Sequence, residues 1–217
     1  FIDTEHQTAR AAVDGADLIV LAAPVGANSL LAEQIAPSLK QGSIITDVGS
    51  VKVSVIRDVQ PHLPDGVHFV PGHPVAGTEY SGPESGFAEL FENRYCILTP
   101  PDGTDQNAID KTQKLWKAAG SIVEIMDADH HDRVLAITSH LPHLIAYTIV
   151  GTANDLEGEL REKKADGEIK IRTADVIKYS AGGFRDFTRI AASDPVMWRD
   201  IFLNNKDAVL EQLGRFI

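Results

Sequence analysis

The chain has 217 residues, 43% of them hydrophobic, and a formal net charge of -11. This length and apolar content suit one large globular domain or two modest ones. The negative charge argues against a nucleic-acid partner, because phosphate binding needs clustered Lys and Arg, and the sequence has no such cluster outside residues 161–164. We find no apolar stretch long enough to cross a bilayer and no signal sequence in residues 1–16, so no membrane partner is expected.

The single cysteine, Cys96, cannot form an internal disulfide. It lies inside the apolar run 95–98, which predicts a buried, inert thiol. A reducing, cytoplasmic location is consistent with this cysteine usage.

Short apolar runs alternate with amphipathic segments over the first 126 residues, a pattern typical of a parallel sheet covered by helices. The expected strands are 17–22, 43–47, 68–70, 95–99 and 121–125. The expected helices are 28–39, with Asn28 or Ser29 as N-cap, 51–60, and 105–119, which is capped at Asp105 and ends at Gly120. The first part of the chain is therefore predicted to form most of a doubly wound, Rossmann-type parallel sheet.

The strand pattern disappears from Asp129 onward. Residues 134–150 are predicted to form one long apolar helix that is buried nearly all round, by another subunit or by a further segment of the same chain. The charged segment 157–170 is expected to be a loop or a short exposed helix, and 195–217 a last helix with proline in its first turn. We therefore predict a nucleotide-binding domain at 1–128 and an all-helical domain at 129–217.

A glycine-rich phosphate loop of the form Gly-x-Gly-x-x-Gly does not follow the first clear strand. That strand leads instead into the turn Ala23-Pro24-Val25-Gly26, as a later strand of such a sheet would. We therefore expect the sheet to lack its first βαβ unit in this sequence.

His73 is the strongest single candidate for a functional group. It is placed between Gly72 and Pro74, just after the predicted strand 68–70, so it would lie at a strand's carboxyl end, where open α/β sheets bind ligands. Glu79 follows as a carboxylate that could pair with a cation. The alternative is a structural turn whose histidine only satisfies a local hydrogen bond.

Three further groups could carry chemistry. The turn 47–50 offers the Ser50 hydroxyl and free backbone N–H groups at the same edge of the sheet. His140 and His143, three residues apart, share a helix face and could point at one ligand or metal. Paired glycines with Arg185 and Arg189 suit an anion.

Each group has a plainer explanation. Zinc is disfavoured for the histidines because no cysteine lies near them, so no metal site is expected. A hydrolase built on Ser50 and His73 lacks the Gly-x-Ser-x-Gly elbow. The arginines, flanked by Asp186 and Asp194, could form only a surface ion-pair network.

Taken together, the motifs 72–82, 139–143 and 183–191 resemble those of the prephenate and arogenate dehydrogenases of tyrosine biosynthesis. They occur in the family's order, joined by 47–52 and 193–200, and the resemblance extends from about Gly15 onward. It is closest to the bacterial cyclohexadienyl type, which accepts both substrates. The resemblance implies oxidative decarboxylation of a cyclohexadienol with hydride transfer to NAD or NADP, a small-molecule substrate, a homodimer, and a helical domain that continues past Ile217.

The resemblance also implies roles for individual residues. His73 would accept the hydrogen bond of the ring hydroxyl, with Ser50 holding both, and Arg189 would bind the side-chain carboxylate of the substrate. His143 would be a second substrate-binding histidine. The remaining implied positions are Glu79 and Asp186 beside the arginine, Gly183 at the substrate, His131 with Asp132 at the entrance, and Ala23, Pro24, Val25, Gly49 and Ser50 along the dinucleotide.

Two alternatives stay open from the sequence. One is another β-hydroxyacid-type dehydrogenase on the same architecture. The other is a non-catalytic relative that keeps the ring-binding pocket and senses tyrosine or prephenate. Both NAD and NADP also stay open, as do prephenate and arogenate, which differ only in a keto or an amino group.

Overall fold

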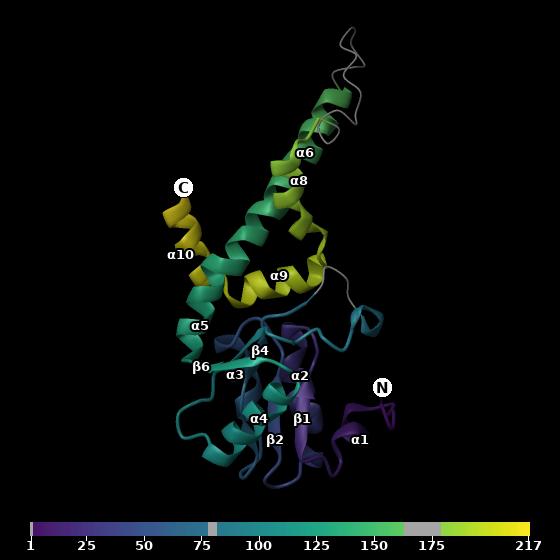
Figure 1. The fold of residues 1–217 in the computed structure, drawn as a ribbon, viewed down its shortest axis with the longest axis vertical. Helices are drawn as coiled ribbons and strands as arrows, with labels where there is room; N and C mark the ends of the chain where they lie inside the picture. The colour runs from purple at the N-terminus through teal and green to yellow at the C-terminus, as the bar shows by residue number, and fades with distance from the viewer. Residues whose placement is uncertain (1, 78–81, 163–178) are drawn as a thin grey trace.

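An α/β domain and a set of helices make up the chain (Figure 1). The structure, a computed structural model, describes residues 2–77, 82–162 and 179–217. The helices rise from one end of the α/β domain, and the longest of them extends away from it. The predicted architecture of an α/β domain with a parallel sheet followed by a helical domain is therefore confirmed.

The six strands described in the α/β domain form two three-stranded sheets. The first is parallel, in the order β1 (Leu18–Leu21), β2 (Ile44–Asp47) and β3 (His68–Phe69). The second contains β4 (Gly72–Pro74), β5 (Tyr95–Leu98) and β6 (Ile122–Ile125), with β5 and β6 parallel. All the predicted strands are present, each shorter by one or two residues.

Strand β4 was not predicted, and it runs antiparallel to β5, with His73 opposite Ile97. His73 therefore lies in a short strand of its own, and not in the structural turn that was the alternative interpretation. Prolines at 71 and 74 suggested a turn, but β4 is only three residues long and lies at the edge of its sheet, where a terminal proline is tolerated.

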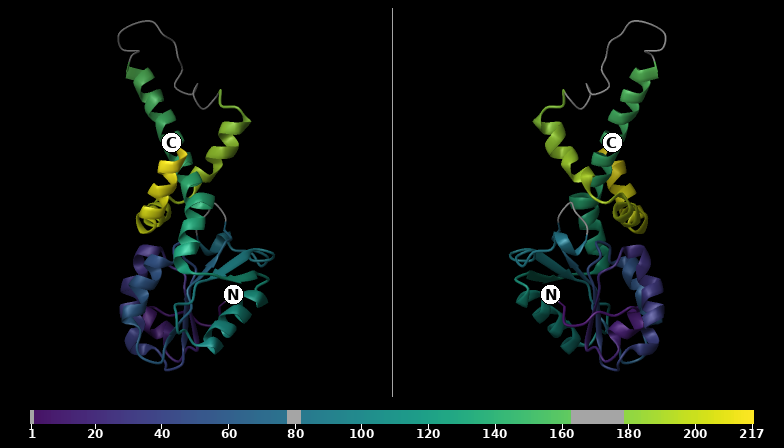
Figure 2. Two further views of the ribbon diagram at one scale, coloured as in Figure 1. Left: turned by 90° about the vertical axis from the view of Figure 1, so that its left-hand side faces the viewer. Right: turned by 90° about the vertical axis from the view of Figure 1, so that its right-hand side faces the viewer.

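Helices cover the strands on two sides (Figure 2). On one side are α1 (Ala9–Val13), which was not predicted, α2 (Asn28–Ile35) and α3 (Val53–Val59), and on the other is α4 (Gln106–Ala118). Among the described residues of this part there are also four 3₁₀ turns: η1 (Val25–Ala27), η2 (Ala36–Ser38), η3 (Gln60–His62) and η4 (Pro83–Ser85). Two separate apolar cores result, one beneath α2 and α3 and one beneath α4.

The predicted caps of these helices have different outcomes. Asp105 caps α4 by accepting from the amide of Ala108 at 3.0 Å, as expected. Asn28, in contrast, is the first residue of α2, is buried, and caps nothing. The preceding turn η1 continues directly into α2, so the amide of Asn28 already donates to the carbonyl of Val25.

The long helix predicted after Asp129 is continuous but not uniform. It consists of α5 (Ala128–Leu135), a π-helical turn η5 (Ala136–His140) and α6 (Leu141–Glu162). In η5 the amide of Leu141 donates to the carbonyl of Ala136, five residues back. The rest of the charged segment up to Lys170 lies outside the described residues.

The expectation that no stretch of the sequence is long and apolar enough to cross a bilayer was wrong for this helix. Residues Ala128–Leu156 form a helix long and apolar enough, by length and composition alone, to cross a membrane, with a mean hydropathy of 1.4. The apolar residues alternate with uncharged polar ones, so no unbroken run reveals the segment. Only 28% of its apolar window is buried, and Ile137, Ile149 and Val150 are exposed, so within this chain the helix is not buried all round.

The last part of the chain contains α8 (Gly182–Thr188), η7 (Arg189–Ala192), α9 (Pro195–Asn204) and α10 (Lys206–Phe216). Pro195 opens α9 as predicted, but the single helix expected to Ile217 is broken at Asn205. Trp198 and Ile201 of α9 pack on Val51, which joins the helices to the α/β domain.

Candidate functional site

His73 is held at the carboxyl end of strand β2. The amide of Gly72 donates to Oδ1 of Asp47, the last residue of β2, at 3.1 Å. Lys52 Nζ donates to Oδ2 of Asp47 at 2.5 Å and to the carbonyl of Gly72 at 2.6 Å. Both side chains of the ion pair are fully buried. The peptide groups of Gly72 are therefore fixed on both sides, next to the carboxyl ends of the parallel strands.

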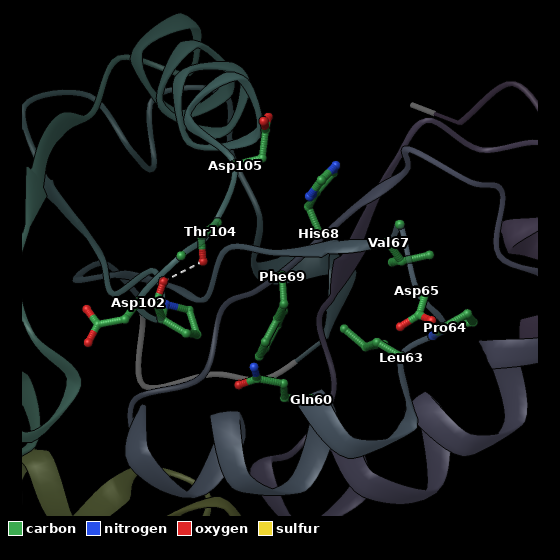
Figure 3. Close-up of a pocket in the computed structure, with 13 residues that line it drawn as sticks. Gln60, Leu63, Pro64, Asp65, Val67, His68, Phe69, Asp102, Thr104 and Asp105 are labelled. Atoms are coloured by element: carbon green, nitrogen blue, oxygen red, sulfur yellow. Dashed lines mark hydrogen bonds between the residues drawn. The ribbon is translucent and has the colours of Figure 1, made fainter.

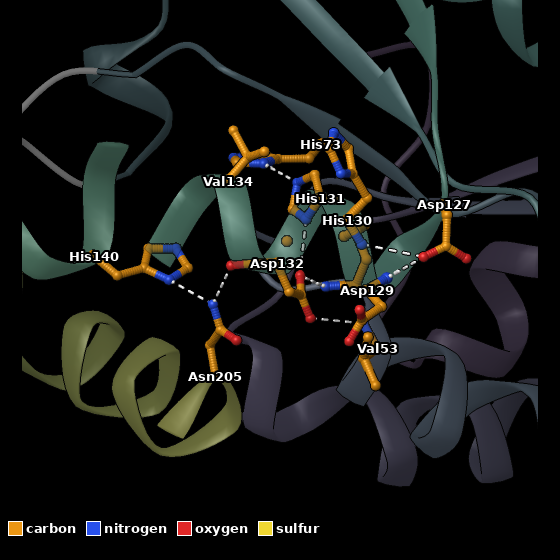
Figure 4. A network of polar contacts seen from close by, with 12 residues as sticks. Val53, His73, Asp127, Asp129, His130, His131, Asp132, Val134, His140 and Asn205 are labelled. Atoms are coloured by element: carbon orange, nitrogen blue, oxygen red, sulfur yellow. Dashed lines mark hydrogen bonds and ion pairs between the residues drawn. The ribbon is translucent and has the colours of Figure 1, made fainter. Parts of the chain in front are cut away.

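A chain of buried polar groups continues from the His73 ring (Figure 4). His73 Nδ1 lies 2.8 Å from His131 Nε2, and His131 Nδ1 lies 2.8 Å from Asp132 Oδ1. The carboxylate of Asp132 also accepts from the backbone amides of Lys52 at 2.8 Å and Val53 at 3.0 Å. The network thus links β4 to α5 and to the start of α3.

Burial determines the charge of His73, whose exposed fraction is 6%. Desolvation is the largest of the causes that hold the pKa of His73 well below 6.5. The smaller causes are the charges of His131, Lys52 and His140. His73 is therefore neutral near pH 7, and a neutral imidazole can accept a proton or a hydrogen bond.

His140 and His143 both contact the Trp198 ring but have different hydrogen-bond partners. Asn205 donates from Nδ2 to the carbonyl of Asp132 at 2.8 Å and to Nδ1 of His140 at 3.0 Å. Burial lowers the pKa of His140 to about 4, although Asp132 and the backbone of Ser50 act in the opposite direction. Among the described residues, the two histidines share no hydrogen-bond partner.

His143 stacks on Trp198, with ring centroids 3.6 Å apart and an interplanar angle of 17°. Its Nδ1 donates to the carbonyl of Ser139 at 2.9 Å, which leaves Nε2 as an acceptor. Burial lowers the pKa of His143. The ring therefore combines an aromatic face held by α9 with a hydrogen-bond acceptor.

The residues predicted to lie along a dinucleotide occupy two turns. Ala23, Pro24 and Val25 follow β1, and Val25 belongs to the buried core. Gly49 follows β2, but its amide donates to Oδ2 of Asp47 at 2.8 Å, so the expected free N–H is already used. A Cβ at Gly49 would lie 2.9 Å from that same oxygen, which explains the glycine.

Among the remaining predicted positions, His131 and Asp132 belong to the hydrogen-bond network of His73 described above. Ser50 is half-buried after β2, and no hydrogen bond between the described residues joins it to His73. Gly183 and Arg189 are exposed in α8 and η7, and η7 packs against α6. Glu79 lies outside the described residues. His131 and Asp132 were expected at the entrance, which is wrong, because both are buried.

Sequence reasoning gave no role to Asp47, Lys52 or Asn205, which hold the site together. One signal was available. Lys52 follows Asp47, the last residue of a buried strand, by five residues. A buried lysine needs an acidic partner, and Asp47 is the nearest one in the sequence. The two side chains form the buried ion pair. No comparable local signal marks Asn205, because its partner Asp132 is 73 residues away.

Two cavities lie away from His73. The one in Figure 3 has a volume of about 300 Å³ and lies between the loop that precedes β3 and the loop 101–105. It contains none of the predicted site residues. The other, about 370 Å³, is lined by Tyr147, Trp198 and Phe202 together with Pro195, Arg199 and Leu203, beside the ring that His143 stacks on.

Comparison with known proteins gives a consistent result along the whole chain. Residues 1–125 match the family model of the prephenate dehydrogenase nucleotide-binding domain, and residues 127–217 match that of the prephenate dehydrogenase dimerization domain. The chain is 48% identical over 206 residues to the cyclohexadienyl dehydrogenase of Zymomonas mobilis, covering 95% of this chain and 66% of that protein. It is 36% identical to the prephenate dehydrogenase of Bacillus subtilis, covering all of this chain and 55% of that one.

A solved structure agrees. The prephenate dehydrogenase from A. aeolicus, in complex with hydroxyphenyl propionate and NAD+, superimposes with a TM-score of 0.84 at 36% identity, covering 99% of this chain and 70% of that one. The chain spans between 55% and 66% of the first three curated relatives that it matches. Because both domain models and these relatives agree, the chain belongs to the prephenate dehydrogenase family.

Proposed function

We propose that the protein oxidatively decarboxylates prephenate, arogenate or both, with hydride transfer to NAD or NADP, in tyrosine biosynthesis. The observation that carries this proposal is the neutral, buried His73 at the carboxyl ends of the parallel strands. A relative that is 48% identical is a cyclohexadienyl dehydrogenase, which supports the same activity here.

The turns after β1 and β2 are proposed to hold the dinucleotide, through Ala23, Pro24, Val25, Gly49 and Ser50. Just beyond the first turn, the buried Asn28 has no partner for either polar atom of its amide among the described residues. A bound polar group could satisfy such a side chain, so the residues present fit a nicotinamide dinucleotide. When bound, the nicotinamide accepts a hydride at C4.

His73 is proposed to accept the proton of the ring hydroxyl. As the hydride leaves the carbon that bears this hydroxyl, the carbonyl character that develops there raises the acidity of the O–H group. The neutral imidazole takes that proton, and the lowered pKa of His73 keeps it available as an acceptor. When carbon dioxide leaves, the electron pair of the broken C–C bond makes the ring aromatic and passes to the ring oxygen, which regains a proton from the protonated His73. Ser50 is proposed to hold the hydroxyl from the neighbouring turn.

Substrate binding is proposed to involve the helices. His143 is proposed to contact the substrate through Nε2, the nitrogen that its hydrogen bond to the Ser139 carbonyl leaves as an acceptor. Arg189 is proposed to bind the side-chain carboxylate, because a guanidinium can do so with two parallel hydrogen bonds. Gly183 and Glu79 are proposed as further substrate-binding residues from the family resemblance. The nucleotide-binding part is proposed to end at residue 128, and 129–217 to carry substrate binding and dimerisation.

A homodimer is the proposed assembly, and the cytoplasm the proposed location. The match of residues 127–217 to a dimerization domain supports the dimer. So do the exposed apolar residues of α6, Ile149 and Val150, together with Ile137 in η5. The buried Cys96, whose pKa burial raises to about 12, needs no oxidising compartment.

The activity is tested by incubating the protein with each of the two substrates and each of the two dinucleotides, and following reduced nicotinamide at 340 nm. We expect reduction in at least one of the four mixtures, with 4-hydroxyphenylpyruvate or tyrosine as the product. No reduction in any mixture, combined with binding of tyrosine or prephenate, would favour the ligand-sensing alternative instead.

A further inference from the structure

The carboxylate of Asp132 defines the direction of the hydrogen bonds that lead to His73. Its two oxygens receive the backbone amides of Lys52 and Val53, and backbone amides can only donate. The side chain of Asp132 is almost completely buried, so these amides and His131 are its surroundings. Asp132 is therefore held in place as an acceptor.

His131 must then donate to Asp132 from Nδ1, which lies 2.8 Å from Oδ1. A neutral imidazole carries one proton, so its other nitrogen, Nε2, is an acceptor. That nitrogen lies 2.8 Å from Nδ1 of His73. His73 must therefore donate from Nδ1, and its own proton is not on Nε2.

The opposite direction is unfavourable. If His131 donated from Nε2 to His73, its Nδ1 would face the carboxylate at 2.8 Å as a second acceptor with no proton between them. A doubly protonated His131 could donate on both sides, but its positive charge would lie 2.8 Å from His73 Nδ1 and oppose the imidazolium that the proposed reaction forms there. Either case would leave the proton of His73 on Nε2.

We propose that His131 is a positioning residue: together with Asp132 it holds His73 in the tautomer with the proton on Nδ1 and the lone pair on Nε2. This inference rests on the proposed function, in which Nε2 of His73 takes the proton of the substrate hydroxyl. After that transfer, Nδ1–H still donates to His131, and the negative charge of Asp132 lies one ring away from the new imidazolium. The same arrangement thus selects the acceptor atom and stabilises the charge that forms on it.

The tautomer can be observed without any substrate. We would label the protein with ¹⁵N-histidine and record two-bond ¹⁵N–¹H correlations near pH 7.5, assigning His73 by the signals lost in His73→Asn. The expected spectrum has a protonated Nδ1 and an unprotonated Nε2 for His73. A wild-type spectrum with the proton on Nε2 of His73 would overturn the proposal, whatever the activity.

Two substitutions at His131 separate positioning from simple support of the fold. His131→Leu removes the acceptor, and His73 is then expected to populate both tautomers. His131→Gln can place its amide oxygen where Nε2 lies, and is expected to keep the proton of His73 on Nδ1. The matched control is His130→Leu, on the neighbouring exposed residue of α5, which should leave the His73 signals unchanged.

Kinetics give the second measurement. In His131→Leu we expect kcat to fall by about 100-fold or more, with KM for the substrate changed little, because wrong-tautomer variants lose catalysis rather than binding. His131→Gln is expected to recover at least tenfold of that loss, since it restores the acceptor. A His131→Leu protein that keeps the Nδ1–H tautomer or full kcat would overturn the proposal. Absence of dehydrogenase activity in the wild type would instead contradict the proposed function, and the spectra would still decide the tautomer.

Discussion

His73 depends on burial for its chemistry. The same imidazole on the surface would be partly protonated near its ordinary pKa of about 6.5, whereas here desolvation keeps it neutral. Its position could be predicted from the sequence, because the glycine and prolines around it are local signals. Its partner His131 could not be predicted, because 58 residues separate the two and only the fold brings them together.

The first prediction concerns His73 itself. His73→Asn removes the proton acceptor while keeping a small polar side chain, so kcat should fall by about 100- to 10,000-fold. KM for the substrate should change little, as measured by initial rates at 340 nm. His68→Asn, at the start of β3, is the control and should keep near-normal turnover. If His73→Asn kept normal turnover, the assigned role would have to be abandoned.

Arg189 allows a second prediction. Arg189→Ala should raise KM for the substrate by roughly tenfold or more while kcat changes less, because it removes a charged contact to a carboxylate. The control is Arg57→Ala, which removes an exposed arginine paired with its neighbour Asp58. An unaltered KM would mean that Arg189 has only a structural or surface role.

At the scale of elements, strands and helices were predictable where one local pattern determines them. Strands β1, β2 and β5 were found because each is a short run of apolar residues, and α4 because a capping aspartate and a terminal glycine mark its ends. The break between α9 and α10 was not predictable. Asn205 ends α9 beside contacts to Asp132 and His140, and neither is near it in the sequence.

The ion pair between Asp47 and Lys52 connects β2 to β4, and a third prediction follows from it. Lys52→Met leaves the charge of Asp47 buried without its partner, so the free energy of unfolding should fall by about 3–5 kcal/mol. Urea denaturation would measure it. Lys40→Met is the matched control, because Lys40 pairs with Asp17 on the surface, and should cost at most about 1 kcal/mol. Equal losses of unfolding free energy in the two variants would contradict a role of the Asp47–Lys52 ion pair in holding β4 against β2.

The contacts between α10 and the long helix should weaken at acidic pH. Unfolded histidine takes up a proton near pH 6.5, whereas folded His140 does so only at about pH 4. The unfolded state therefore binds more protons in this interval, and stability falls as the pH drops from 6.5 to 4, by roughly 3 kcal/mol from His140 alone. Thermal unfolding at several pH values would measure it. In His140→Gln the slope should become shallower, and an unchanged slope would exclude His140 as its source.

At the scale of the whole molecule, the long helix keeps apolar residues exposed, because the rest of the described chain covers only part of its surface. The sequence predicted the helix and that another subunit or a further segment of the same chain would cover it, but not which of its residues remain exposed. That depends on where α9 and α10 pack, and hence on the break at Asn205.

The fifth prediction tests the proposed dimer. Ile149→Asp places a charge on the exposed face of α6, so the mass measured by light scattering should fall from two chains to one. Leu30→Asp, on the exposed side of α2 in the α/β domain, should leave the mass unchanged. A wild-type protein that is monomeric in buffer, or that co-sediments with lipid vesicles, would contradict a homodimer through this face.

The π-helical turn η5 acts as a phase adjustment within the long helix. An α-helix turns about 100° per residue, so the one extra residue accommodated between Ala136 and His140 rotates everything beyond it by about that angle. Ahead of the turn, the helix directs His131 toward His73; beyond it, the same helix directs His143 toward Trp198. Deleting a single residue from this turn would leave every functional side chain in the sequence, yet direct the two halves of the site away from each other.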